Sequence, residues 1–136
     1  MLIKISFLLT INIIVANQFS HIDDLQWENR LLIIRNDGLK VLKKIEYHKD
    51  GFDERDFIIV TIKAKDVFID KELTSRLFSK SVLKKIQKTS DEHNIILIGK
   101  DGDIKEHYKP KVMIESIFFD VDQMLMRKYE VLRKNK

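Results

Sequence analysis

Residues 94–105 read Asn-Ile-Ile-Leu-Ile-Gly-Lys-Asp-Gly-Asp-Ile-Lys, and this stretch decides the fold. Four consecutive apolar residues, Ile95 to Ile98, are followed by Gly99 and by the pair Asp101-Gly102. A short apolar run that ends at glycine is typical of a buried strand, and Asp-Gly is typical of a tight two-residue turn between antiparallel strands. We therefore expect a β-hairpin whose second strand spans residues 104–108.

Two more strands and several helices are expected around this hairpin. The runs at 31–34 and 57–62 are apolar on successive positions, which is typical of strands that are buried on both faces. Apolar residues at helical spacing predict helices, and Pro110 suits the first turn of one of them. The predicted helices span about 39–48, 70–88 and 110–121, with a further helical segment over 124–136.

The order of these elements predicts the topology. A right-handed crossover makes the first two strands parallel, and the tight turn makes the last two antiparallel. The predicted fold class is α/β and thioredoxin-like: a mixed four-stranded sheet with helices on both faces, in the order β-α-β-α-β-β-α plus a C-terminal helix. Residues 63–70 read as a short extra strand or a loop.

The composition indicates one folded domain and excludes several chemistries. The 136 residues are 44% hydrophobic and 34% charged, and the net charge of +4 is spread along the chain. Such a surplus suits an acidic partner or an anionic membrane surface, whereas a nucleic-acid binder usually concentrates its basic residues with aromatics among them. The chain has no cysteine, so thiol-disulfide oxidoreductase and thiol peroxidase activities are excluded.

The first residues are typical of a secretory leader. A single lysine near the start precedes the mostly apolar run 5–15, and Ala16 is a suitable cleavage point. We expect a signal peptide over 1–16, a spacer over 17–24 and a folded domain over 25–136, with a periplasmic or secreted mature protein and no transmembrane anchor after cleavage. The alternatives are that the apolar run is a first buried strand, or that it is retained as an anchor.

Four stretches of the sequence resemble one protein family. They are Leu25-Gln26-Trp27-Glu28-Asn29-Arg30-Leu31-Leu32, Glu54-Arg55-Asp56-Phe57-Ile58-Ile59-Val60, Leu97-Ile98-Gly99-Lys100-Asp101-Gly102 and Asp122-Gln123-Met124-Leu125-Met126-Arg127-Lys128-Tyr129-Glu130. Each is a weak motif, but all four in this order resemble the family known as domain of unknown function 4174. The resemblance implies a thioredoxin-like or peroxiredoxin-like domain of exported bacterial proteins and of vertebrate sushi-repeat and coiled-coil-domain matrix proteins, with no established reaction.

The chain departs from the family pattern in two places. The family usually has proline between the two methionines of the last motif, where this chain has Leu125, and the segment 66–80 is longer and more irregular than usual. The charged and aromatic residues within the motifs are candidate functional positions, for which we expect structural roles: ion pairs of Arg55 and Asp56 that fix the loop before the second strand, and coverage of one end of the core by Trp27. The alternative for Arg30 and Arg127 is that they bind a ligand. The candidates are Trp27, Arg30, Arg55, Asp56 and Arg127.

The loop after the first strand is the other candidate site. In redox-active relatives of this fold the loop places cysteine at a helix amino terminus. Here it reads Arg35-Asn36-Asp37-Gly38, which leaves free N–H groups and a positive charge that suit an anion. The alternative is that Asn36 and Asp37 only cap the helix.

No cofactor or metal site is expected. The glycines at 38, 51, 99 and 102 form no phosphate loop or dinucleotide fingerprint, and His21, His48, His93 and His107 show no spacing typical of zinc ligands. We expect a non-catalytic binding module for a protein, glycan or envelope component and no nucleic-acid partner. The alternative is an enzyme or redox accessory protein that uses the first βα loop for non-thiol chemistry or anion binding.

Overall fold

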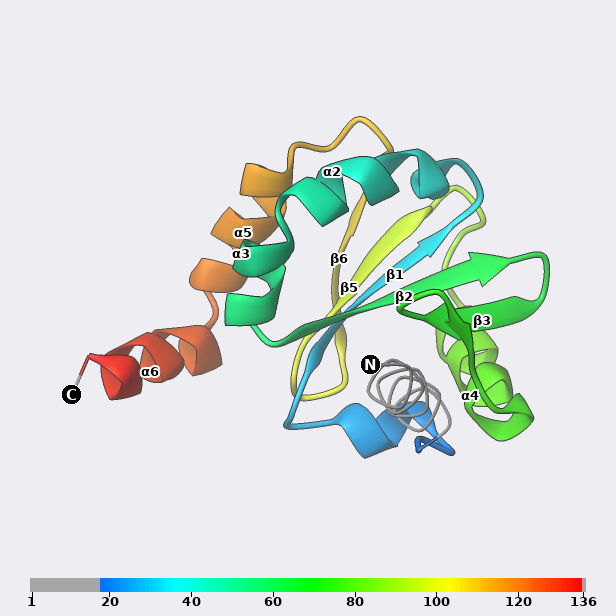
Figure 1. The fold of residues 1–136 in the computed structure, drawn as a ribbon, viewed down its shortest axis with the longest axis horizontal. Coiled ribbons are helices and arrows are strands. Elements are labelled where there is room, and N and C mark those ends of the chain that lie inside the picture. Colours follow the sequence, from blue (N-terminus) through cyan, green and yellow to red (C-terminus); the bar gives the residue numbers. More distant parts are fainter. Residues whose placement is uncertain (1–17, 136) are drawn as a thin grey trace, which may run out of the picture.

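The computed structural model of the protein describes residues 18–135 (Figure 1), so the predicted leader at 1–16 lies outside the described residues. Within them the chain forms a mixed α/β fold with five α-helices around one six-stranded sheet of order β4-β3-β2-β1-β5-β6. The strands are β1 (Arg30–Arg35), β2 (Phe57–Lys63), β3 (Asp66–Ile69), β4 (Glu72–Leu73), β5 (Ile95–Ile98) and β6 (Ile104–Tyr108). The helices are η1 (Ile22–Leu25), η2 (Asn36–Val41), α2 (Leu42–Tyr47), α3 (Lys49–Glu54), α4 (Arg76–Ile86), α5 (Ile114–Asp122) and α6 (Leu125–Lys134), of which η1 and η2 are 3-10 helices.

The central strand β1 runs parallel to β2 and antiparallel to β5. This agrees with the predicted pairing directions, and β5 and β6 form the predicted antiparallel hairpin. The predicted count of four strands is wrong, because the segment after β2 folds back as β3 and β4 and extends the sheet to six strands. In β3 the residues Val67 and Ile69 are buried and Phe68 is half-buried, which is the alternation of a strand that covers a core with one face.

The second predicted helix begins later than its sequence pattern indicates. It was predicted to begin at residue 70, but Asp70 and Lys71 have φ angles of 49° and 70° and form the turn between β3 and β4. The cap is Ser75, whose side chain accepts a hydrogen bond from the N–H of Phe78. The first crossover also continues past the predicted helix end at residue 48, because Lys49–Glu54 form a further helix, α3.

The β5–β6 turn is longer by one residue than the predicted two-residue turn. The N–H of Gly99 donates to the carbonyl of Asp103, and Gly102 donates to the carbonyl of Gly99, which leaves Lys100 to Gly102 as the loop. Gly102 has a φ of 84°, as expected of the left-handed residue that follows a type I turn in a three-residue hairpin loop. This geometry places Lys100 at the first loop position, directly after the buried strand.

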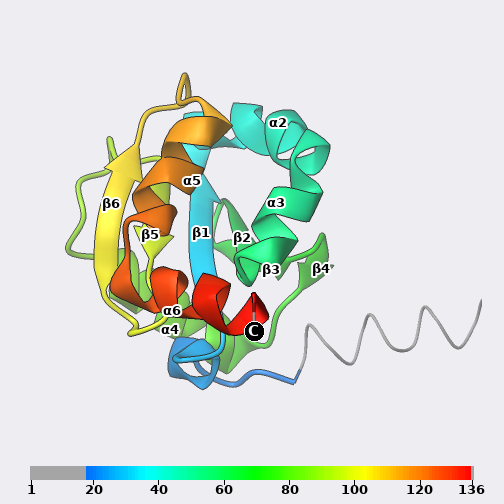
Figure 2. The same cartoon turned by 90° about the vertical axis from the view of Figure 1, so that its left-hand side faces the viewer.

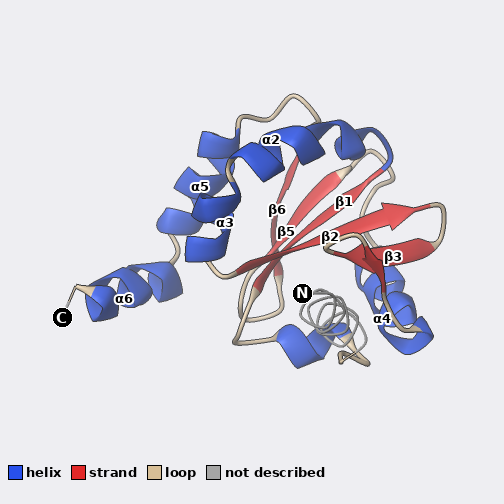
Figure 3. Ribbon diagram, in the orientation of Figure 1, coloured by secondary structure: helices blue, strands red, loops and turns tan. Residues whose placement is uncertain are grey.

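Helices cover both faces of the sheet (Figures 2 and 3). Alternate residues of β1, such as Leu31 and Ile33, pack with η1 and α4 on one face, whereas Leu32 and Ile34 pack with α2, α3 and α5 on the other. Because Ile22 in η1 is buried in the first of these cores, the folded part of the chain begins ahead of Leu25. No helix within residues 18–135 is long and apolar enough to cross a membrane.

Candidate functional site

Charged residues from all four family-like stretches meet beside the amino end of β1. Arg30 begins that strand, residues 54–56 join α3 to β2, Lys100 lies in the hairpin loop, and residues 122–130 run from the end of α5 into α6. We refer to these charged side chains as the charge cluster. Its members are Arg30, Arg55, Lys100 and Arg127, with Glu54, Asp56, Asp122 and Glu130.

The centre of the charge cluster is Glu130, which α6 inserts between two cations. Nη1 and Nη2 of Arg30 donate to the two carboxylate oxygens of Glu130 at 3.2 and 3.3 Å, and Nζ of Lys100 lies 2.7 Å from Oε1. Arg30, Lys100 and Glu130 are 0%, 9% and 7% exposed, so this arrangement is removed from water. Lys100 also donates to Asp56 at 2.8 Å.

Arg127 continues the charge cluster toward the surface. It is 3% exposed, and its guanidinium donates to the carboxylates of Glu54 and Asp122 at 2.9 and 3.3 Å. Arg55 donates both Nε and Nη2 to Asp122 at 3.0 Å and lies 4.1 Å from the ring centroid of Phe118. The predicted ion pairing of Arg55 therefore occurs, but with Asp122 of α5, while its sequence neighbour Asp56 pairs with Lys100.

The electrostatics of the charge cluster favour the ionised forms of Glu130 and Asp122. Burial by itself would raise the pKa of Glu130, but the hydrogen bonds and positive charges of Lys100 and Arg30 outweigh it and hold that pKa below its usual range. The pKa of Asp122 is lowered for the same reason, against burial, by Arg55 and Arg127. The charge cluster holds four basic and four acidic side chains, so their formal charges balance.

Such buried ion pairs add little net stability over an apolar core, because each charge loses its hydration. They do dictate geometry, since a displaced partner leaves a buried charge unpaired. The contacts of Arg127 and Glu130 therefore fix α6 in one orientation on the domain. The charge cluster is therefore the surface through which α6 binds to the rest of the domain.

The orientation of α6 is the reverse of an ordinary surface helix. Its buried residues are Arg127 and Glu130, while the apolar residues point to solvent. We call this outer surface the apolar ridge; it consists of Leu125, Met126, Tyr129 and Leu132, which are 66%, 37%, 56% and 60% exposed. An exposed apolar patch with a fixed orientation is typical of a binding surface.

The loop candidate Arg35–Gly38 lies at the opposite end of β1 and is not part of the charge cluster. Arg35 donates from Nε to the carbonyl of His93 and from Nη2 to Thr89 and Ser90. Neither Asn36 nor Asp37 caps η2, which has no side-chain cap. The structure thus gives Arg35 a contact with the segment that precedes β5.

One other expectation from the sequence does not hold. Trp27 is 60% exposed and does not cover the core; its backbone N–H donates to the carbonyl of Lys100 instead. Two of the histidines lie together, since the rings of His93 and His107 stack with centroids 3.6 Å apart. Within residues 18–135, no group of three or more histidine or acidic side chains is arranged to hold a metal ion.

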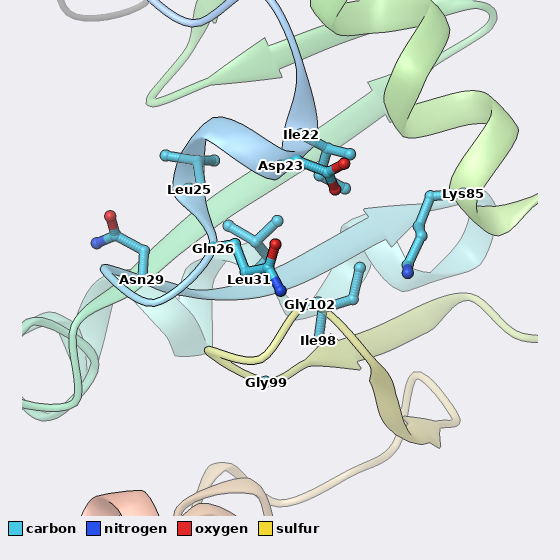
Figure 4. Close-up of a pocket in the computed structure, with 10 residues that line it drawn as sticks. All are labelled: Ile22, Asp23, Leu25, Gln26, Asn29, Leu31, Lys85, Ile98, Gly99 and Gly102. Carbon is cyan, nitrogen blue, oxygen red and sulfur yellow. The ribbon is translucent and has the colours of Figure 1, made fainter.

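A small cavity lies between η1 and the β5–β6 loop (Figure 4). Its volume of about 10 Å³ is the space of one water molecule, so it is not a ligand site. Beside it, Nε2 of Gln26 donates to the carbonyl of Asp101 at 2.8 Å and ties η1 to the loop.

Sequence reasoning singled out half of the charge cluster and missed the rest. Arg30, Arg55, Asp56 and Arg127 were candidates, whereas Lys100 was interpreted only as part of a turn. The four overlooked members are Glu54, Lys100, Asp122 and Glu130. All of them lie inside the motifs quoted above. These motifs together hold six acidic and five basic residues, and this near balance of charge was the available signal.

Comparison with known protein families assigns the chain. The family model described as Domain of unknown function (DUF4174) matches residues 21–130, which includes every member of the charge cluster. Comparisons with curated proteins and with solved structures gave no significant match. The chain therefore belongs to the DUF4174 family of domains of unknown function.

Proposed function

We propose that the protein is an exported, thioredoxin-like domain that has no thiol redox site and serves as a non-catalytic interaction module. The thioredoxin-like assignment is supported by four adjacent strands, β2, β1, β5 and β6, in which β1 is parallel to β2 and antiparallel to β5. Export is supported by the apolar run and small residue near the amino terminus. The absence of cysteine removes the chemistry for which this fold is best known.

One observation carries the interaction role: α6 docks through Arg127 and Glu130 and turns its apolar ridge to solvent. Burying the ridge against the domain would have been favourable, since each apolar side chain gains about 1.5–3 kcal/mol when fully removed from water. The charge cluster instead holds the ridge outward. A surface that is kept apolar at this cost serves a partner.

Site-specific crosslinking tests the proposal in the native host. The chain lacks cysteine, so Tyr129→Cys provides a single attachment point for a photoreactive probe on the apolar ridge. Tyr47→Cys on α2 is the matched control, because Tyr47 is 87% exposed and lies outside the ridge. We expect a discrete adduct from position 129 that is lost when Leu125 and Leu132 are changed to serine, and none from position 47.

Two results would contradict the proposal. Equal labelling from positions 129 and 47 would remove the interaction role from α6. A turnover activity that is lost on changing one residue outside the ridge would show that the protein is an enzyme and not a non-catalytic binding module. The proposed export has its own test. The intact mass of the soluble protein from the native host should equal that of the chain without residues 1–16.

A further inference from the structure

We infer that the partner of α6 is the surface of an anionic membrane, on which the helix lies with its apolar ridge among the lipids. This inference rests on the proposed interaction role of α6 and names the class of partner. It is carried by the distribution of charge on the helix, by its length and by the shape of its surroundings.

The exposed charges of α6 are all positive. Its one acidic residue, Glu130, is buried against Arg30 and Lys100, whereas Lys128, Arg133 and Lys134 are exposed. Positive charge beside an apolar surface favours an anionic partner, and a second copy of the chain that contacted α6 with its own α6 would bring further exposed cations to the contact.

The positions of these cations suit a lipid surface. At about 100° per residue, the outward direction of α6 falls among Leu125, Tyr129 and Leu132, the three central members of the ridge. Lys128 lies about 40° beyond Leu132 on one side of this stripe and Arg133 about 40° beyond Tyr129 on the other, with Met126 about 20° past Arg133. Long basic side chains at the edges of an apolar stripe reach the lipid headgroups while the stripe enters the acyl boundary. This is the arrangement of an amphipathic helix that lies in the plane of a membrane.

Length excludes one other mode of binding, and shape gives no support to a second. A helix of 10 residues is about 15 Å long, about half of the hydrocarbon thickness of a bilayer, so α6 lies on a membrane and does not cross it. The hollow beside the ridge is lined by α6 residues alone, namely Met126, Tyr129, Leu132 and Arg133, so the described part of the domain forms no groove there that would receive a partner helix. α6 projects beyond α5 at one end of the long axis (Figure 1), and the ridge residues are exposed, so the ridge is open to a flat surface.

The test follows one position of the ridge directly. Leu132→Cys carries an environment-sensitive fluorophore, and Leu77→Cys on α4 is the matched control, since Leu77 is 66% exposed on another helix. The labelled full chain is titrated with vesicles of phosphatidylcholine that contain about one third phosphatidylglycerol, and with pure phosphatidylcholine vesicles. This local readout is independent of any affinity that residues near the amino terminus have for lipid.

We expect a blue shift and higher intensity from position 132 with the anionic vesicles, a much weaker response with pure phosphatidylcholine, and none from position 77. Lys128→Gln with Arg133→Gln should weaken the binding of the labelled protein by about tenfold or more. The matched control is Lys80→Gln with Lys84→Gln on α4. This control removes the same charge from another helix and should change the affinity for the anionic vesicles by less than twofold.

Other outcomes would overturn the inference. No response from position 132, or an equal response with neutral vesicles, would exclude an anionic membrane. If the crosslink from position 129 nevertheless joins a protein, the proposed interaction role stands and its partner is that protein. A dimer that forms at micromolar concentration and is lost in the Leu125→Ser/Leu132→Ser variant would assign the ridge to a second copy.

Discussion

Arg30 on β1 and Glu130 on α6 meet through two hydrogen bonds across a separation of 100 residues, and both side chains are buried. The pair joins β1, one of the two middle strands of the sheet, to the last helix. Lys100 adds a third contact from the hairpin loop, so one carboxylate ties together three distant parts of the chain. The position of α6 depends on this carboxylate.

Replacing the Glu130 carboxylate should lower the free energy of unfolding. In Glu130→Gln, the buried Arg30 and Lys100 lose their shared negative charge, as does Arg127, whose Nη1 lies 3.6 Å from Oε2 of Glu130. Removing one partner of a buried ion pair typically costs about 3–5 kcal/mol. We expect a loss of this size in the free energy of unfolding, measured by urea denaturation. Hydrogen exchange should show the first loss of protection in α6, the element that Glu130 anchors.

Glu115→Gln is the control for this substitution. Its side chain is 66% exposed and contacts only His48 among the ion pairs of the described residues, so the change should be within about 0.5 kcal/mol. A loss below about 1 kcal/mol for Glu130→Gln would show that the charge cluster does not hold α6.

The same carboxylate predicts a dependence of stability on acid. The pKa of Glu130 is lowered in the folded protein, so its contribution is fully present above the pKa of an unfolded glutamate and is lost as the pH falls through the lower folded value. Asp122 follows the same rule. We expect the free energy of unfolding to fall from about pH 4 downward, measured by urea denaturation at successive pH values.

Glu130→Gln should flatten part of this acid limb. An identical slope in the variant and the wild type would place the responsible carboxylates elsewhere.

The departure from the family at position 125 yields a prediction of the opposite sign. Leu125 is the first residue of α6, where proline is favoured because its N–H would have no partner in the helix. The preceding Met124 is extended, with φ −72° and ψ 139°, as a residue before proline prefers. We expect Leu125→Pro to leave the free energy of unfolding unchanged or to raise it by up to about 1 kcal/mol.

Leu132→Pro is the contrast, because it removes an N–H from the interior of the same helix and should cost about 3 kcal/mol of helix stability. If Leu125→Pro is as damaging as Leu132→Pro in a thermal melt, α6 begins before residue 125.

The extent to which the sequence predicts this fold differs between its parts. Unbroken apolar runs such as 31–34 and 95–98 predict the central strands because such runs are buried on both faces. The edge hairpin of β3 and β4 was missed as part of the sheet because its turn uses Asp70 and Lys71 in left-handed conformations, which the sequence does not mark with glycine. Short edge strands are set by tertiary contacts and carry weak local signals.

The charge cluster was only half visible for a similar reason. Helical periodicity in α6 predicts that Leu125, Tyr129 and Leu132 face the core, which is the usual rule for surface helices. The structure reverses it because Glu130 has buried cationic partners on β1 and in the hairpin loop. Those partners are distant in sequence, so no local pattern reveals them.

The hairpin loop offers a test of backbone geometry. Gly102 has a φ of 84°, and a side chain there would meet Gln26 only at ordinary contact distance, so conformation and not space requires glycine. We expect Gly102→Ala to destabilise the protein by about 1–2 kcal/mol, measured by urea denaturation. Gly102→Asn should cost less, because asparagine tolerates this conformation, and an equal cost for both would point to crowding.

Arg35 allows the loop prediction to be separated from a structural role. Its guanidinium donates to Thr89, Ser90 and the carbonyl of His93, so Arg35→Ala leaves several acceptors unpaired and should cost about 1–3 kcal/mol. Arg76→Ala, an exposed arginine in the first turn of α4, is the control and should change stability by less than about 0.5 kcal/mol.

Thermal melts in rising phosphate then decide whether the loop also binds an anion, because a ligand of the folded state raises the melting temperature with its concentration. We expect wild type and Arg35→Ala to respond alike to phosphate; a rise seen only in the wild type would establish the anion site at residues 35–38.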